Sequence, residues 1–503
     1  MDKKIICSLL GNILVAFTFT FAIPIIYAVT TSFSIHALLV FSLTGIFTGI
    51  LGVTLARYGR NHKRRLPIFT SALVLLLSYP LIALIAMIPF LWSGWLFPFD
   101  AILETFSDVT SAGVSLLSPN APYILRLWQS VLMWFGSLIF LIMLVTLMPD
   151  VGGSFGLTMS LQGGQLFSPL FGQMNTMAQR MIKVYGGLTI LSFALFKAAG
   201  LNFWDALLMA MRCISTGGGD FFPSRGNFYV EATAIFSMLI ACGNFLLYYR
   251  LIQTLPPPRT GDKVNFFKRV IRYVKRLYQN FFGNIKILFS NSEIQLCTLI
   301  IFFSVLFISV TILFHNPQLK IGSVIWYAFF HIVSYISTTG INVTPFDVTP
   351  DFDKFLVFLM AMCGGCMGSV TGGLKLMRVL VLFKTTAAEL KKTIHPHMIP
   401  SVRVNQTAVP PQIVGRILGY FFLVFITLFV CAAILSFTGS QFSEAVGISA
   451  VCLTNVGSLP GIVDPEVFMR LSDAAKIFCS VILIIGRVEI FALFIVIAGL
   501  LKI

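Results

Sequence analysis

The sequence predicts an all-α polytopic membrane protein made of four related repeats that follow two extra N-terminal transmembrane helices. The first observation is composition. Of the 503 residues, 57% are hydrophobic and 11% are charged, so a soluble chain of this length would lack the polar residues needed to cover its core. The second observation is a series of apolar stretches long enough to cross a bilayer. The third is a short pattern that occurs four times.

The apolar stretches predict ten membrane spans, because a helix that crosses the hydrocarbon core needs about 20 apolar residues. They cover residues 5–30, 33–56, 67–92, 124–149, 183–200, 228–252, 293–315, 353–383, 413–437 and 472–501. An even number of spans places both termini on the same side. The first stretch is longer than the apolar part of a signal peptide, so we expect it to be retained with its basic end in the cytoplasm.

The charges predict the orientation. The formal net charge is +16, and its basic residues gather between spans two and three, six and seven, and eight and nine. These loops are expected in the cytoplasm, and no nucleic-acid partner is expected. The basic, helix-like region within 257–292 could lie on anionic membrane lipids or meet a partner subunit. The opposite side is expected to be acidic, as suits the approach of a cation. Its acids are Asp100, Glu104, Asp220, Asp347, Asp351, Asp353, Asp464 and Glu466.

The fourfold pattern ends in a glycine, with a hydroxyl-bearing residue three positions earlier and an alanine twelve positions earlier. A shared register over this length is typical of an internal repeat. We number the four-residue segments in chain order. Segment 1 is Thr110, Ser111, Ala112 and Gly113; segment 2 is Ser215, Thr216, Gly217 and Gly218; segment 3 is Ser337, Thr338, Thr339 and Gly340; segment 4 is Thr454, Asn455, Val456 and Gly457.

Each segment follows an apolar run of about a dozen residues, which is too short to span a bilayer and predicts a re-entrant helix. Irregular backbone at membrane depth is stable only inside protein or beside a wet cavity. Four equivalent segments would line one pore, where their carbonyls could replace the hydration shell of a monovalent cation. The hydroxyl could add an oxygen ligand or hold the segment in place. Tight turns between packed helices are the competing interpretation, but turns do not require a shared register.

The repeats also predict a domain division. Residues 1–66 form the two N-terminal helices, 67–150 repeat 1, 151–256 repeat 2, 257–292 the basic cytoplasmic segment, 293–392 repeat 3 and 393–503 repeat 4. The sixteen residues of segments 1 to 4 are the predicted ion-binding site, for potassium or sodium. Oxygen ligands without converging carboxylates suit a monovalent cation better than a divalent one.

A glycine-rich loop, residues 364–375, interrupts the apolar stretch 353–383. So many glycines destabilise a helix, and a flexible loop here could obstruct the pore. A phosphate-binding loop would need lysine where Leu374 stands. Arg487 is an intramembrane charge that should face the interior, in the pore or in an ion pair with Glu489 or another buried acid. Lys375 could join the loop or extend to the membrane edge. The predicted gate comprises Gly364, Gly365, Gly368, Ser369, Thr371, Gly372, Gly373, Lys375 and Arg487.

Catalytic residues and an organic cofactor are not expected. The sequence has no cluster of His, Asp and Cys at membrane depth, which argues against an enzyme. Cys363 and Cys366 form a C-x-x-C motif, but a zinc site would need a second pair of ligands nearby. Most of the nine cysteines lie inside apolar runs and are expected to be inert, buried thiols.

Three stretches resemble the Trk/Ktr/HKT superfamily of potassium and sodium translocating subunits, and the bacterial TrkH/TrkG type in particular. Segments 2 and 3 look like its selectivity filter, the glycine-rich loop looks like its break within a helix of the third repeat, and residues 486–491 look like the motif of its last helix. The resemblance covers essentially the whole chain. It implies potassium uptake across the bacterial inner membrane through a gated, channel-like pore; a potassium/sodium or potassium/proton symporter of the same fold is the alternative.

The resemblance implies further properties. They are a homodimer with one pore per subunit, a cytoplasmic nucleotide-binding partner of the TrkA type, a gating role for the glycine-rich loop and a place for Arg487 in the pore beneath the filter. Gly113 favours potassium, because some plant relatives have serine there and favour sodium. Gly219 stands where the family commonly has an aromatic residue, so the packing behind segment 2 is expected to be looser.

Overall fold

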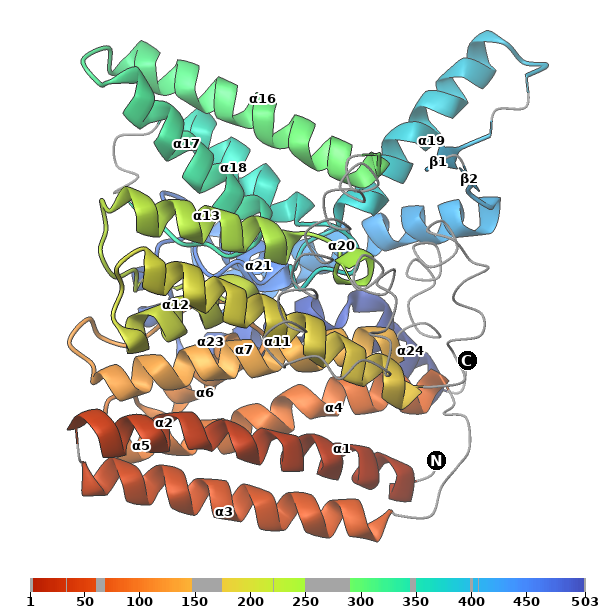
Figure 1. The fold of residues 1–503 in the computed structure, drawn as a ribbon. Coiled ribbons are helices and arrows are strands. Elements are labelled where there is room, and N and C mark those ends of the chain that lie inside the picture. The colour runs from red at the N-terminus through yellow and green to blue at the C-terminus, as the bar shows by residue number, and fades with distance from the viewer. Residues whose placement is uncertain are drawn as a thin grey trace, which may run out of the picture.

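The protein is described here by a computed structural model covering residues 3–32, 34–59, 68–146, 174–219, 221–248, 290–343, 350–398, 401–405 and 407–501. Most of the predicted basic segment, together with Asp220 and Asp347, lies outside the described residues. The described chain is a bundle of helices running side by side, with the start of α1 and the end of α24 at the same end of the molecule (Figure 1). The predicted all-α membrane fold is confirmed.

The two N-terminal spans pack against each other as an antiparallel pair. The first runs through α1 (Lys3–Thr18), η1 (Phe19–Phe21), α2 (Ala22–Tyr27) and η2 (Ala28–Ser32), and the second is α3 (Ile35–Tyr58). Glycines let the two backbones approach closely, as is common between membrane helices. A side chain at Gly11 would overlap the backbone of Ala56, and a Cβ at Gly52 would lie 2.9 Å from the amide nitrogen of Val15.

Four repeats follow, each with a long helix, a short helix that ends at a repeated segment, and a return helix. The short helices are 12 to 16 residues long. Repeat 1 contains α4 (Ile68–Ala86), α5 (Ile88–Ser93), α6 (Pro98–Val109) and α7 (Tyr123–Thr146); repeat 2 contains α11 (Met174–Ala198), α12 (Phe203–Ser215) and α13 (Phe228–Cys242); repeat 3 contains α16 (Ser292–His315), α17 (Ile321–Ile336), α18 (Asp351–Cys363) and α19 (Leu376–Ile394); repeat 4 contains α20 (Pro411–Phe437), α21 (Phe442–Thr454), α22 (Pro465–Met469), α23 (Asp473–Val488) and α24 (Ile490–Leu501).

Three of the ten predicted spans are not continuous helices. Seven helices of the described chain are long and apolar enough to cross a membrane. The number is eight if α23 and α24, which meet at a bend of 103°, are counted as one span. The stretch 228–252 breaks at Gly243, where a side chain would overlap the hydroxyl of Tyr248. The stretch 353–383 is split by the glycine-rich loop between α18 and α19. Hydropathy detects apolar length, but a break made by close packing leaves hydropathy unchanged.

A small hairpin was not predicted. Strands β1 (Arg403–Val404) and β2 (Thr407–Ala408) pair antiparallel between α19 and α20. Asn405 has a φ of 47°, which asparagine tolerates better than most residues. Its side-chain oxygen accepts a hydrogen bond of 2.8 Å from the Ser292 amide, so the hairpin is attached to the start of α16.

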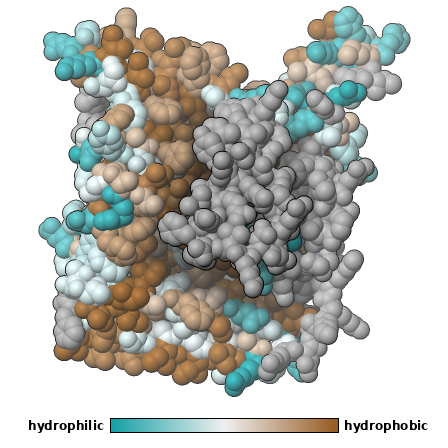
Figure 2. Space-filling view, in the orientation of Figure 1, coloured by the Kyte–Doolittle hydropathy of each residue, from teal (hydrophilic) through white to brown (hydrophobic). Residues whose placement is uncertain are grey.

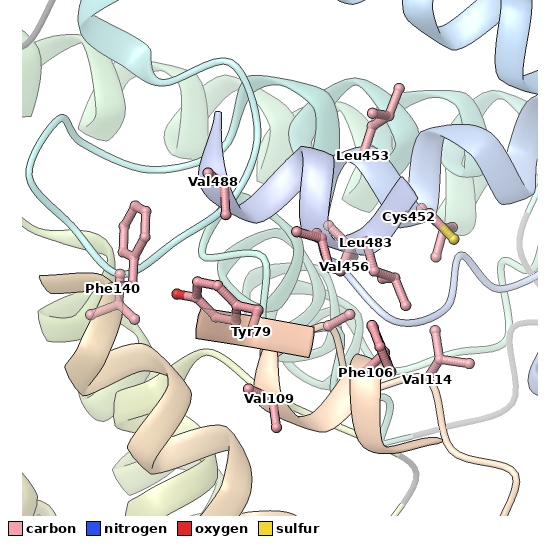
Figure 3. Close-up of a cluster of buried hydrophobic side chains, with 14 of the residues drawn as sticks. Tyr79, Phe106, Val109, Val114, Phe140, Cys452, Leu453, Val456, Leu483 and Val488 are labelled. Atoms are coloured by element: carbon pink, nitrogen blue, oxygen red, sulfur yellow. The ribbon is translucent and has the colours of Figure 1, made fainter. Parts of the chain in front are cut away.

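Apolar side chains from several repeats pack around the repeated segments. Figure 3 shows Phe106 and Val109 of α6, Leu483 and Val488 of α23 and Val456 of segment 4 among the side chains of one buried apolar cluster. The outer helix faces are also apolar, and hydrophilic residues gather at the edge where the short helices begin (Figure 2). This distribution fits a bundle whose sides face hydrocarbon and whose ends face water.

Candidate functional site

The four segments share an unusual backbone conformation. The last residue of each segment is a glycine, which we call its anchor glycine. The residue two positions before the anchor glycine and the anchor glycine itself both have positive φ, while the residue between them does not. The angles are 58° and 81° in segment 1, 55° and 47° in segment 2, 54° and 71° in segment 3, and 52° and 93° in segment 4. Alternation in the sign of φ turns successive carbonyls towards the same side of a chain. The fourfold register of the sequence is therefore also a fourfold register of backbone shape.

The segments meet in a closed ring. In the following segment, the residue just before the anchor glycine places its carbonyl oxygen where a Cβ on the first anchor glycine would lie. Segment 4 contacts segment 1 in the same way. The pairs are Gly113 with Gly217, Gly218 with Thr339, Gly340 with Val456, and Gly457 with Ala112. Four segments that each contact the next one around a cycle surround a single axis. All sixteen predicted residues are thereby brought to one place.

The first residue of each segment holds it to its own short helix. The hydroxyl of Thr110 donates to the Phe106 carbonyl at 2.7 Å, and that of Thr454 donates to the Ala450 carbonyl at 2.8 Å. Ser215 and Ser337 donate in the same manner to carbonyls three residues back, at 3.2 and 3.0 Å. The hydroxyl hydrogens thus fix the segments, which is one of the two roles that the sequence left open.

In three of the segments, the second residue forms a hydrogen bond with a neighbouring helix or with the glycine-rich loop. The Ser111 hydroxyl donates to the Met133 carbonyl of α7 at 3.0 Å, and the Asn455 amide donates to the Leu483 carbonyl of α23 at 3.1 Å. The Thr338 hydroxyl accepts a bond of 2.9 Å from the Gly372 amide of the glycine-rich loop. Segments 1, 3 and 4 are therefore each held both by their own short helix and by a second element.

The glycine-rich loop lies directly against segments 3 and 4. Besides the bond to Thr338, a side chain at Gly372 would overlap the carbonyl oxygen of Thr454. The loop is held from other directions as well. The Cys366 amide donates to the Cys242 carbonyl at 2.9 Å, and the Met367 amide donates to the Glu293 carboxylate at 2.5 Å. All its predicted gate residues come together beside one end of the ring.

Arg487 joins the loop to repeats 1 and 2. Its guanidinium donates to the Val370 carbonyl and to the Ser137 hydroxyl, both at 2.8 Å, and lies 4.5 Å from the ring centroid of Phe140. Ser137 in turn bonds to the Ser111 hydroxyl at 2.6 Å and to the Ser215 carbonyl at 2.8 Å. The positive charge of Arg487 is therefore linked to segments 1 and 2 through a single residue, Ser137.

The ion pair considered for Arg487 is made by another arginine. Glu489 pairs with Arg378 of α19 at 2.6 Å, and the Arg378 guanidinium also lies 3.9 Å from the ring centroid of Tyr420. Within the described residues, Arg487 has no carboxylate at ion-pair distance. Glu489 has a φ of 66° at the bend between α23 and α24, so the bend directs the two neighbouring charges to different partners.

Lys375 does not extend to the membrane edge. Its ammonium folds back onto the loop, where it donates to the Thr371 carbonyl and hydroxyl, and it lies 3.4 Å from the Ser369 hydroxyl. Its φ of 70° is unusual for a residue with a side chain. Lysine therefore closes the loop internally.

The cavity next to segments 1 and 2 carries more positive charge than the sequence suggested for the predicted acidic side. A cavity of 860 Å³ is lined by residues that follow segments 1 and 2 and by part of α22; its charged lining residues are Arg126, Arg212, Arg225, Asp464, Glu466 and Arg470. Glu104, expected among the outer acids, is instead fully buried within α6. Sequence reasoning missed Arg212, Ser137, Glu293 and Arg378. The charged ones could have been found from the rule that ionisable groups at membrane depth have a function.

The bent and broken helices, the closed ring and the loop beneath it define a multi-pass membrane protein of the cation-transport class. The family model described as "TrkH: Cation transport protein" matches residues 86–501. The chain belongs to this family.

Relatives named "Trk system potassium uptake protein TrkH" include the Halomonas elongata protein, which is 24% identical with 98% of this chain and 97% of the relative covered. The Escherichia coli K12 protein of the same name is 25% identical, with 98% of each chain covered. The crystal structure of the potassium transporter TrkH from Vibrio parahaemolyticus matches with a TM-score of 0.83, 24% identity and 98% of both chains covered. This likeness confirms the predicted fold.

Proposed function

We propose that this chain is the pore subunit of a potassium uptake system, which passes K+ across the bacterial inner membrane through the ring of segments 1 to 4. The closed ring of glycine–carbonyl contacts carries the proposal, because carbonyls directed to the axis can replace the water that a monovalent cation gives up. The names of the relatives supply the ion. An inside-negative potential favours inward movement by about 2.3 kcal/mol per charge per 100 mV.

The gate in this proposal is the glycine-rich loop together with Arg487. The loop contacts segments 3 and 4 through Thr338 and Thr454, so it stands where an ion leaving the ring would pass. The Arg487 charge is held beside it through Val370. A fixed positive charge repels a cation strongly where little water screens it. Conduction requires the loop to move aside.

The assembly and orientation belong to the same proposal. Both termini are cytoplasmic, the protein is a homodimer in contact with membrane lipids, and a cytoplasmic nucleotide-binding subunit of the TrkA type controls the gate. The expression "Trk system" in the relatives' names supports a multi-component assembly, and the basic loops support the orientation.

Symport of potassium with sodium or protons is the second candidate. It needs an acid at membrane depth that can take up the coupling ion. Glu489 is occupied by Arg378. Asp108 of α6 is the acid that favours symport, since it is fully buried and neither carboxylate oxygen has a hydrogen-bond partner among the described residues. Asp108→Asn would abolish a coupled flux.

The test is cation flux into liposomes that contain the purified chain, with K+, Rb+, Na+ and Li+ compared at a fixed inside-negative potential. Saturable K+ and Rb+ flux that exceeds Na+ flux, without a second ion gradient, is the expected result. Flux that requires a Na+ or H+ gradient, and that Asp108→Asn abolishes, would favour symport. If the chain is silent, Arg487→Gln is measured in parallel; a silent variant as well would contradict the pore.

A further inference from the structure

A guanidinium group fills the space behind segment 2 that the sequence left unexplained. Gly219 directly follows the anchor glycine of segment 2 and has a φ of 93°. A Cβ on Gly219 would lie 3.0 Å from the Nη1 atom of Arg212. Arg212 belongs to α12, the short helix that leads into segment 2, and is 2% exposed. The expected loose packing at Gly219 is therefore replaced by close packing against a charged side chain.

Arg212 links segment 2 to repeat 1. Its Nε atom donates to the Ser130 hydroxyl at 2.8 Å, and its Nη2 atom donates to the Gln129 side-chain oxygen at 3.1 Å. Both partners lie on α7. Its Nη1 atom lies 3.5 Å from the carbonyl oxygen of Phe221, three residues beyond segment 2. A planar guanidinium presents its donors in a fixed fork that suits several acceptors at once, whereas a lysine ammonium is a compact point charge on a flexible stem.

The link continues to the chain that follows segment 1. The Gln129 amide donates to the carboxylate of Glu104 on α6. That carboxylate also accepts a bond of 2.5 Å from the Leu116 amide and one of 3.3 Å from the Ser115 hydroxyl. Arg212, Gln129 and Glu104 thus form an unbroken hydrogen-bonded bridge. It connects the outer end of segment 1 to the outer end of segment 2.

The bridge also brings a buried cation close to buried acids. Asp108 lies one helical turn after Glu104 on α6 and is fully buried. The Arg212 guanidinium is hydrogen-bonded to Gln129, and Gln129 is hydrogen-bonded to Glu104. Without Arg212, Glu104 would lose the cation to which Gln129 connects it, and unpaired buried charges are strongly unfavourable. The positive charge of Arg212 is therefore required at this place.

We propose that Arg212, acting through Gln129 and Glu104, is a positioning residue for ion selectivity. This inference rests on the proposed function. The bridge fixes the outer spacing of segments 1 and 2, whose anchor contact is Gly113 against the Gly217 carbonyl. A carbonyl ring discriminates between K+ and Na+ through the number and placement of its oxygens, so a bridge that holds two of its four segments controls the ratio of the two fluxes.

The test compares K+ and Na+ flux in liposomes for Arg212→Met, Arg212→Lys and Gln129→Met. Arg212→Met and Gln129→Met should lower the K+/Na+ flux ratio about three- to tenfold, since each leaves buried polar groups without partners. Arg212→Lys keeps the charge and should restore part of the ratio. The double variant Arg212→Met/Gln129→Met should be no worse than Arg212→Met, because both residues belong to one bridge.

Lys476→Met is the matched control. Lys476 forms an ion pair of 2.6 Å with Asp100 and joins α23 to the first turn of α6, and neither residue belongs to the bridge. The substitution should lower thermal stability without changing the flux ratio. An unchanged ratio in a folded Arg212→Met protein would overturn the bridge. If Arg212→Met does not fold, unchanged ratios in both Arg212→Lys and Gln129→Met would overturn it. A wild-type protein without potassium preference would overturn the proposed function as well.

Discussion

At the anchor glycines, two separate physical requirements exclude a side chain. Gly113 has a φ of 81°, a region in which an L-residue costs about 1–2 kcal/mol. Its missing Cβ also leaves room for the Gly217 carbonyl oxygen. The first requirement concerns the conformation of one segment, and the second concerns the spacing between two. A substitution therefore disturbs both the segment and its neighbour.

Gly113→Ser should admit more Na+ relative to K+. The added Cβ would displace the Gly217 carbonyl. If this displacement changes the relative binding free energy of K+ and Na+ by about 1.4 kcal/mol, the preference for K+ over Na+ changes tenfold. The measurement is the K+/Na+ flux ratio in liposomes. Gly415→Ala is the control, since a Cβ on Gly415 meets nothing within 4 Å. A ratio unchanged in both variants would remove segment 1 from the selectivity site.

At the scale of elements, interrupted helices supply the parts that can move. The last span bends by 103° between α23 and α24, and α18 is separated from α19 by the glycine-rich loop. The two breaks are joined twice, by Arg487 with Val370 and by Arg378 with Glu489. Displacement of the loop therefore requires that contacts to the last span rearrange. In the proposed gating mechanism, the last span therefore moves together with the loop.

Arg487→Gln should raise conductance severalfold. It removes a positive charge beside the ring and weakens the bond that holds the loop at Val370. The measurement is K+ flux without any regulatory partner. Arg470→Gln is the control, because Arg470 forms an exposed pair with Glu466 at 3.1 Å and exposed pairs contribute little. A folded Arg487→Gln protein with unchanged flux would assign Arg487 a structural role.

At the scale of the whole molecule, the proposed orientation of the bundle rests on its charges. The exposed end of α19 carries Lys391 and Lys392, whereas the cavity over segments 1 and 2 has a mixture of both signs. The positive-inside rule depends on lysines and arginines of short loops and not on acids. The mixed charge around the cavity is therefore compatible with an outer location.

Cysteine labelling should reveal this orientation. In intact cells, Asn120→Cys, on the exposed turn before α7, should react with a membrane-impermeant maleimide. Thr393→Cys, near the end of α19, should react only after permeabilisation. The unsubstituted chain gives the background, since seven of its nine cysteines are buried. The opposite pattern would reverse the assigned orientation.

The sequence alone predicted the helical membrane class, the four repeats and the residues of segments 1 to 4. These features follow from local apolar length and from a register repeated along the chain, and both are properties of the sequence itself. It also placed the glycine-rich loop and Arg487 at membrane depth. It could not show that Glu489 pairs with Arg378 or that Lys375 folds back, because each depends on a neighbour distant in the chain or on one unusual φ angle.

Only the tertiary structure revealed how the segments meet and what lies behind them. The ring closes through contacts between residues more than one hundred positions apart, such as Gly113 with Gly217 and Gly340 with Val456. The bridge from Arg212 to Glu104 likewise joins the short helices α12 and α6 through Gln129 of the long helix α7. Glu104 looked like an outer acid because a short helix between two loops has no hydropathy signal of burial. Packing of the repeats around one axis buries it, and a linear pattern does not contain that packing.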